Sequence, residues 1–193
     1  MIDFAVLASG AGTNLQAILD FGIEGLQVVI SDVQSAQALQ RAGEAGIPTE
    51  TVPFTGNRAV FTEAICETAA RYGAKALVLA GFMRVLGPEA IERFPHRILN
   101  IHPSLLPAFP GVNAVSQALS YGVTVTGVTV HFVDEQVDHG PIIAQRAVPI
   151  LPGDDEGSLH ARIQKVEHDL YPRVVAAFLR GEVLVEHGKV VFG

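Results

Sequence analysis

The feature that most constrains the fold of this chain is a regular alternation of short apolar runs with longer segments of helical periodicity. The apolar runs have the length and composition of strands that are buried on both faces. Strands that alternate with helices in this way form right-handed βαβ units and a parallel sheet. The pattern predicts strands at 3–9, 26–31, 49–52, 76–81 and 97–102, with helices at 13–22, 35–46 and 58–73.

The second half of the chain follows a different pattern. Residues 126–135 alternate between apolar and polar side chains, and residues 141–150 follow them after a turn, as antiparallel strands do. We expect this pair to extend the parallel sheet. A long helix is expected from Ser158, and Pro172 is expected to kink or divide it, because proline removes a helical hydrogen bond. The tail, residues 183–192, has the pattern of a hairpin that turns at its central His-Gly pair.

These elements predict an α/β fold with one open, mostly parallel, Rossmann-like sheet, helices on both of its faces and an antiparallel extension in the C-terminal half. A length of 193 residues suits a single domain that spans residues 1–193. Hydrophobic residues make up 49% of the chain and charged residues 17%, so a packed core is expected and disorder is not.

Composition also limits the partners and the location of the protein. The net charge is −7 and there is no cluster of Lys and Arg, which argues against nucleic acid as a partner. The longest apolar stretches are too short to span a membrane, and the first residues lack the basic segment of a signal peptide. Cys66 is the only cysteine, so no internal disulfide can form, which suits the cytoplasm, where we expect the protein.

The turn after the first strand, Ser-Gly-Ala-Gly-Thr-Asn at 9–14, places two glycines at the start of a helix. Glycines let the backbone approach an anion, and the N–H groups of the helix start donate to it. A small phosphate group is the favoured ligand, and a dinucleotide site or a turn without a ligand are the alternatives. The third glycine of a dinucleotide fingerprint is Leu15 here, although Asp32 lies where a ribose-binding acid is expected.

Residues 99–107, Leu-Asn-Ile-His-Pro-Ser-Leu-Leu-Pro, place polar side chains within an apolar run. Asn100 and His102 lie one residue apart on a strand, so their side chains leave the same face and open into the ligand crevice at the end of the strand. A histidine exchanges protons near neutral pH, and an amide donates to an oxygen that gains negative charge. Asp138, in the turn between the two C-terminal strands, is the candidate for the carboxylate that orients His102.

The alternative is that these groups are structural, with His102 as a buried, hydrogen-bonded histidine and Asn100 as a turn residue. A metal site is disfavoured, because the seven histidines are scattered and there is neither a His-Glu-x-x-His motif nor a cysteine pair. We therefore expect no metal at the site.

Five segments of the chain occur in the order found in the folate-dependent formyltransferases. They are "LASGAGTNLQAI", "VLAGFMRVL", "LNIHPSLLPAFPG", "TGVTVHFVDEQVDHGPII" and "EHDLYPRVV". The chain resembles this family from residue 2 to about residue 180. The loop at 9–14 and the short chain resemble in particular its phosphoribosylglycinamide formyltransferase (GAR transformylase) members.

The resemblance implies roles for particular residues. It implies a catalytic trio of Asn100, His102 and Asp138, substrate contacts from Gly12, Thr13, Asn14, Arg58 and Glu167, and folate contacts from Leu79, Met83, Arg84, Val85, Leu86, Asp134 and Val137. Without the resemblance, Met83 and Leu86 would be assigned to the core, and Glu167 to a solvated helix face.

The resemblance also implies a reaction, the transfer of the formyl group of the cosubstrate 10-formyltetrahydrofolate to the amino group of glycinamide ribonucleotide in de novo purine synthesis. Asn100 and protonated His102 are then expected to stabilise the charged oxygen of a tetrahedral intermediate, while Asp138 favours the imidazolium. A monomer or a homodimer is expected, without nucleic acid or a membrane as partner. The alternatives are another folate-dependent formyltransferase, a formyltetrahydrofolate hydrolase and a non-catalytic nucleotide-binding module.

Overall fold

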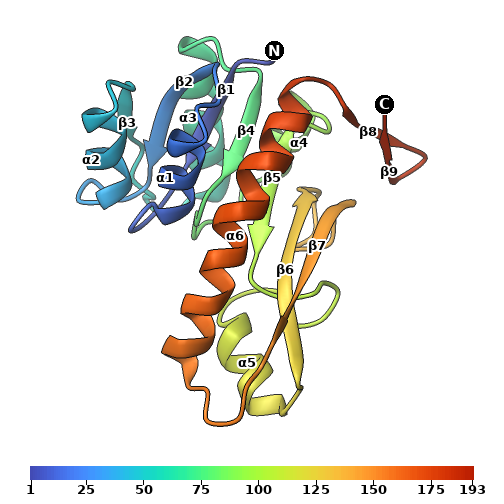
Figure 1. The fold of residues 1–193 in the computed structure, drawn as a ribbon. Helices are drawn as coiled ribbons and strands as arrows, with labels where there is room; N and C mark the ends of the chain where they lie inside the picture. Colours follow the sequence, from blue (N-terminus) through green and yellow to red (C-terminus); the bar gives the residue numbers. More distant parts are fainter.

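The computed structural model describes residues 1–193, and its centre is one seven-stranded sheet with the order β3-β2-β1-β4-β5-β6-β7 (Figure 1). The first five strands of the chain run parallel to one another, and β6 and β7 continue the sheet in antiparallel pairing. The predicted α/β class and the antiparallel extension are therefore confirmed. The strands are β1 (Phe4–Leu7), β2 (Leu26–Ser31), β3 (Thr49–Thr51), β4 (Ala76–Leu79), β5 (Ile98–His102), β6 (Val125–Phe132) and β7 (Ile142–Pro149).

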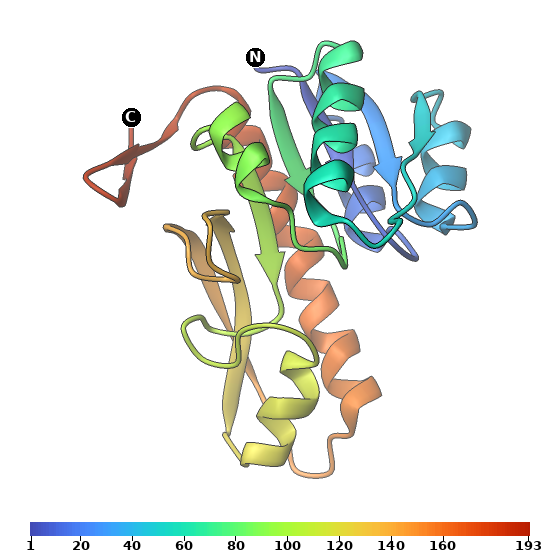
Figure 2. The same cartoon turned by 180° about the vertical axis from the view of Figure 1, so that it is seen from behind.

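Helices cover both faces of the sheet, as expected. One face packs against α1, α2 and α6 around a core of 28 buried residues (Figure 1), and the opposite face packs against α3 and α4 around a second core of 15 (Figure 2). The helices are α1 (Thr13–Asp20), α2 (Gln37–Glu44), α3 (Arg58–Arg71), α4 (Pro88–Arg93), α5 (Ala114–Tyr121) and α6 (Glu156–Leu179). No helix is both long enough and apolar enough to cross a lipid bilayer.

Of the two outcomes expected at Pro172, a kink or a division of the long helix, the division is wrong, because α6 continues through Pro172 to Leu179. Proline in a helix interior costs roughly 3 kcal/mol. The half of α6 that contains Pro172 is packed against the sheet, and Tyr171 and Val175 are fully buried there. Burial of such side chains contributes about 1.5–3 kcal/mol each, which outweighs the lost hydrogen bond. The helix also begins two residues earlier than predicted, after a capping box in which Asp155 is the N-cap.

Two short helices, α4 and α5, were not predicted. The first has only six residues, and Asn113 precedes the second with a positive φ of 60°. The predicted C-terminal hairpin is confirmed as β8 (Val183–Glu186) and β9 (Lys189–Phe192), which form a separate two-stranded sheet.

The strand order reverses between β1 and β4, and this reversal creates the ligand crevice of an open α/β sheet. The loops that follow the two strands are joined there, because Ser9 N donates to Gly81 O at 3.1 Å and Met83 N donates to Ser9 Oγ at 2.9 Å. From the opposite side, the buried hydroxyl of Tyr171 donates to Leu79 O at 2.7 Å. The loops after β1 and β4 are thereby held together at the carboxyl ends of their strands.

Candidate active site

A cavity of about 330 Å³ opens at the carboxyl ends of β4 and β5 and is lined by 22 residues. Its walls come from the loop after β4, the segment before α5 and the loop between β6 and β7. The structure brings ten of the predicted site residues to this one cavity: Leu79, Met83, Arg84, Val85, Leu86, Asn100, His102, Asp134, Val137 and Asp138.

The predicted trio converges at one side of the cavity. Asp138 Oδ2 lies 3.2 Å from His102 Nδ1, and its Oδ1 accepts from Asn100 Nδ2 at 3.3 Å. The two strand residues leave the same face of β5, as their spacing predicts, and the carboxylate reaches them from the β6–β7 loop. The alternative role of Asn100 as a turn residue does not apply, because Asn100 lies within β5.

Both ring nitrogens of His102 face hydrogen-bond acceptors. Nδ1 faces the Asp138 carboxylate, and Nε2 lies 2.8 Å from the carbonyl oxygen of Phe109. A carbonyl oxygen can only accept, so Nε2 carries a proton, and a second proton on Nδ1 completes the contact with the carboxylate. Only the imidazolium form of the ring, with a proton on each nitrogen, can donate to both of these acceptors.

The loop that carries Phe109 is anchored to β6. The Thr129 hydroxyl donates to Ser104 O at 2.7 Å and accepts from Leu106 N at 3.0 Å. Phe109 itself has a positive φ of 53°, a conformation that costs energy for a bulky residue and directs its carbonyl at the histidine.

Asp138 is held in an unusual backbone conformation with φ 51°. Its Oδ2 also accepts from Gly111 N at 2.7 Å, so one carboxylate joins β5, the β6–β7 loop and the segment before α5. Burial raises the pKa of Asp138, but the nearby His131 ring, the hydrogen bond from Gly111 N and the positive charge of His102 outweigh burial. The net pKa lies below its ordinary value, so Asp138 stays ionised at neutral pH.

His131 is a site residue that the sequence did not reveal. It lies on β6 opposite Asn100, is almost fully buried, and places Nε2 3.3 Å from Asn100 Nδ2 and 3.7 Å from Asp138 Oδ1. Its other nitrogen, Nδ1, donates to Phe132 O at 2.8 Å. No three His, Cys, Asp or Glu side chains in residues 1–193 are arranged to hold a metal ion.

The core assignment made without the resemblance is wrong for Met83, whereas Leu86 packs against the second core and also lines the cavity. Met83 is 72% exposed and lines the cavity mouth, so it is not a core residue. Arg84 lies over the Phe54 ring and donates to Asp32 Oδ2 at 2.7 Å. Because the Asp32 side chain is 2% exposed and paired, it is not available to hold a ribose, which argues against the dinucleotide alternative.

The glycine loop, which is the turn at residues 9–14, and α6 meet beside the trio. Asn14 Nδ2 donates to Glu167 Oε2 at 3.0 Å, and both side chains are buried. Burial raises the pKa of Glu167, while Asn14 and the charges of His160 and His102 partly oppose that shift. The solvated helix face expected for Glu167 is therefore wrong, since the position next to the apolar stripe of α6 is covered by α1.

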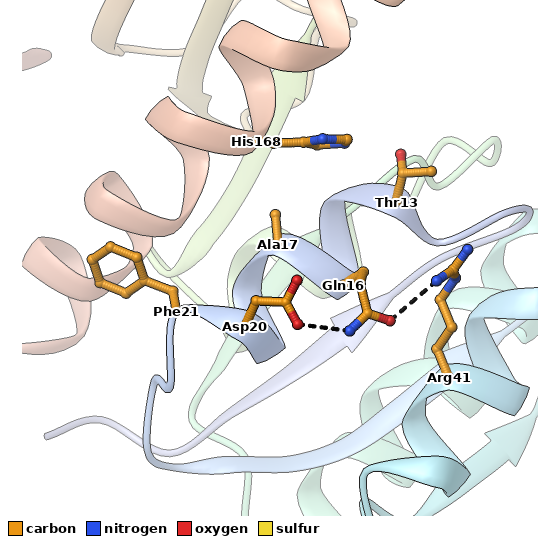
Figure 3. A pocket seen from close by; sticks show the side chains of 7 residues that line it. All are labelled: Thr13, Gln16, Ala17, Asp20, Phe21, Arg41 and His168. Atoms are coloured by element: carbon orange, nitrogen blue, oxygen red, sulfur yellow. Dashed lines mark hydrogen bonds between the residues drawn. The ribbon is translucent and has the colours of Figure 1, made fainter.

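A second cavity of about 450 Å³ lies beside the glycine loop, between α1, α2 and α6 (Figure 3). Thr13 lines it together with Gln16, Arg41 and His168, and the His168 ring extends from α6 toward Thr13 (Figure 3). Arg58, predicted to line the substrate site, lies exposed at the first turn of α3 and lines neither cavity.

An open α/β sheet with an amide, an imidazole and a carboxylate gathered at the end of its central strand defines the class of the protein. The sequence profile of the family described as formyl transferase matches residues 2–175. The chain therefore belongs to the formyl transferase family.

Several relatives are similar to this chain over nearly its whole length. The phosphoribosylglycinamide formyltransferase of Mycobacterium tuberculosis (strain ATCC 25618 / H37Rv) is 44% identical over 193 residues, which cover 97% of this chain and 87% of that protein. The human trifunctional purine biosynthetic protein adenosine-3 is 43% identical over 96% of this chain and 19% of its own length. The crystal structure of glycinamide ribonucleotide transformylase 1 from Symbiobacterium toebii matches with a TM-score of 0.95 and 47% identity, over 100% of this chain and 94% of that one. The resemblance predicted from the motifs is confirmed.

Proposed function

We propose that this protein transfers the formyl group of 10-formyltetrahydrofolate to the amino group of glycinamide ribonucleotide, a step of de novo purine synthesis in the cytoplasm. The observation that carries the proposal is the convergence of Asn100, His102 and Asp138 at one side of a cavity in which 10 of the 22 lining residues are hydrophobic. The name of one relative, phosphoribosylglycinamide formyltransferase, supports formyl transfer and the choice of the ribonucleotide, and the name of the other supports a role in purine synthesis.

The cavity fits a folate in size and chemistry. Its volume of about 330 Å³ lies within the range of small-molecule sites, and 10 of its 22 lining residues are hydrophobic, as a flat aromatic ring system requires. Arg84 is the one permanently charged cation in the lining, so it is suited to an anionic tail at the cavity mouth.

His102 is suited to stabilise the negative charge that develops on the acyl oxygen during transfer to an amine. Its Nε2 proton is directed at the neutral Phe109 carbonyl. A developing oxyanion is a stronger acceptor than a neutral carbonyl, so it takes over this hydrogen bond when it forms nearby. Because Asp138 stays ionised, its role is to hold the ring charged and oriented rather than to donate a proton.

Asn100 supplies a second donor to the same oxygen. Its amide nitrogen contacts Asp138 and His131 at 3.3 Å each, which is long for a hydrogen bond with a nitrogen donor. Such weak contacts are readily exchanged for a short bond to a charged oxygen.

The ribonucleotide is placed by the glycine loop and α6. We assign its phosphate to the start of α1, at Gly12, Thr13 and Asn14, and its glycinamide end to Glu167. Glu167 is close enough to His102 for their charges to interact, so a substrate bound between them presents its amine to the trio. The role of Arg58 as a substrate contact stays a prediction, and it requires a movement of the start of α3.

The test is an absorbance assay of formyl transfer with both substrates, run beside a control that lacks the ribonucleotide. We expect transfer only with both present, and a release of formate without ribonucleotide would indicate the hydrolase instead. Because loss of one oxyanion donor costs roughly 3 kcal/mol, His102→Ala and Asp138→Ala are each expected to lower turnover by about 10² to 10³ while ribonucleotide binding survives. Asp169→Ala, on the exposed face of α6, is the matched control. Wild-type turnover in both trio variants would disprove the assignment.

A further inference from the structure

Helix α2 contacts three consecutive residues of the glycine loop, Gly10, Ala11 and Gly12. Ala38 N donates to Gly10 O at 3.1 Å, and Arg41 Nε donates to Ala11 O at 2.8 Å. Gly12 packs directly on the same helix, because a Cβ added to it would lie 2.7 Å from Ala38 Cα. Gly12 also has a positive φ of 71°, so both space and conformation require glycine there.

These contacts orient the N–H groups that an anion needs. In a trans peptide the C=O of one residue and the N–H of the next lie in one plane and point in opposite directions. By holding Gly10 O and Ala11 O, α2 therefore aims the N–H groups of Ala11 and Gly12 away from itself. Neither of these two N–H groups donates to any group of the protein, so both are free for a ligand.

Arg41 also ties the loop to α1. Its Nη1 donates to Gln16 Oε1 at 3.1 Å, and Gln16 Nε2 donates in turn to Asp20 Oδ1 at 2.8 Å (Figure 3). One guanidinium thus fixes both the loop and the helix that follows it. The rigid fork of arginine donates to the two acceptors from two separate nitrogens, whereas all donors of lysine lie on one nitrogen. The partly buried cation also lies beside a site that is assigned to an anion.

We propose that Arg41 is the positioning residue for the phosphate of the ribonucleotide substrate, because it fixes the peptide plane between Ala11 and Gly12 and thereby aims the donors that bind the phosphate. The inference rests on the proposed function for the identity of the substrate. Arg41 is distant in sequence from the glycine loop and does not belong to any motif that predicted the site.

The test compares steady-state kinetics of the full chain with Arg41→Met and Arg41→Lys. Misplacement of a binding group lowers productive binding steeply, so Arg41→Met is expected to raise the KM for the ribonucleotide about tenfold or more, with the KM for the folate unchanged. Arg41→Lys keeps the charge without the fork and is expected to give an intermediate rise. Arg173→Met removes an exposed arginine of α6 and should leave both constants unchanged. Equal rises in both Michaelis constants, or no rise, would overturn the inference.

A binding measurement separates this inference from the proposed function. Calorimetric titration with ribose 5-phosphate, and with ribose as the control that lacks phosphate, reports on the loop without any turnover. We expect wild type to bind only the phosphorylated sugar and Arg41→Met to bind it about tenfold more weakly, with an unchanged far-ultraviolet circular dichroism spectrum. A wild-type chain that transfers no formyl group yet shows this difference would refute the proposed function and support the role of Arg41. Equal affinities in the two chains, or no binding by wild type, would contradict that role.

Discussion

At the scale of single residues, the carboxylate of Asp138 explains why the trio holds together. It accepts from Gly111 N and Asn100 Nδ2 and faces the His102 ring, so three segments of the chain share one charge. The positive φ of Asp138 costs energy in a residue with a side chain. The site keeps that conformation because an ionised carboxylate repays it with charge-assisted hydrogen bonds.

Glu167 is the residue whose charge opposes folding. Burial raises its pKa above the ordinary value of 4.5, so the folded state binds this proton more tightly than the unfolded state. The free-energy cost of burying the charged carboxylate is therefore absent below about pH 4, where both states are protonated. It grows as the pH rises through the folded-state pKa. Glu167→Gln keeps an acceptor for Asn14 without the charge, and we expect it to raise the melting temperature by roughly 2–4 °C at pH 8 and by less at pH 4. Thermal unfolding by circular dichroism measures both values.

The matched control is Glu67→Gln, which removes the same charge from an exposed position of α3 and should leave the melting temperature unchanged at either pH. A Glu167→Gln variant less stable than wild type at pH 8 would show that the carboxylate stabilises the fold. In the transfer assay the same variant is expected to raise the KM for the ribonucleotide, so stability and binding change in opposite directions.

Spacing along one strand predicts neighbours within that strand, and this is why Asn100 and His102 could be placed from the sequence. His131 could not, because its partners lie on β5 and in the β6–β7 loop, and strand register is not visible in a single sequence. A signal was present, however. His131 interrupts the apolar positions of a buried strand, and a buried imidazole requires hydrogen-bond partners.

At the scale of elements, the β6–β7 loop is fixed in place by Gly140. A Cβ added there would overlap the Phe132 carbonyl oxygen and lie 2.9 Å from the Phe132 carbonyl carbon, so the backbone two residues after Asp138 has no room for a side chain. Gly140→Ala is expected to displace the carboxylate and lower kcat about tenfold or more, because small shifts of a catalytic group are costly. The transfer assay measures it, with Gly157→Ala in α6 as the control that should retain full kcat. Full activity in Gly140→Ala would mean that the loop adapts without moving Asp138.

Elements were predictable where local pattern decides them. The five parallel strands and the helices α1, α2 and α3 follow from apolar periodicity, which buried strands and amphipathic helices must show. The exceptions are settled by tertiary contacts. Pro172 stays inside α6 because the flanking residues are buried against the sheet, and α5 begins after Asn113 although that residue has a positive φ. A local window of sequence shows neither tertiary packing nor backbone strain.

At the scale of the whole molecule, the sheet separates two hydrophobic cores. The site lies at the carboxyl ends of the central strands, where both cores end. The trio and the cavity depend on β4 and β5, whose side chains enter both cores. Tyr171 connects α6 to the central strand β4, since its hydroxyl donates to the carbonyl of Leu79, the last residue of β4. Loss of either core is therefore expected to remove the site together with the fold.

Cys66 provides a test of that cooperativity, because it is the only thiol and lies fully buried in the core between α3 and the sheet. Burial raises its pKa to about 11, so at pH 8 the native thiol is both shielded and protonated. Labelling with a disulfide reagent is expected to be negligible in the native protein and to rise with urea in parallel with the loss of circular dichroism and of formyl transfer. Denatured protein, which should label fully, is the control. If labelling became fast at urea concentrations that leave transfer intact, the α3 face would open by itself, and the two cores would not unfold as one unit.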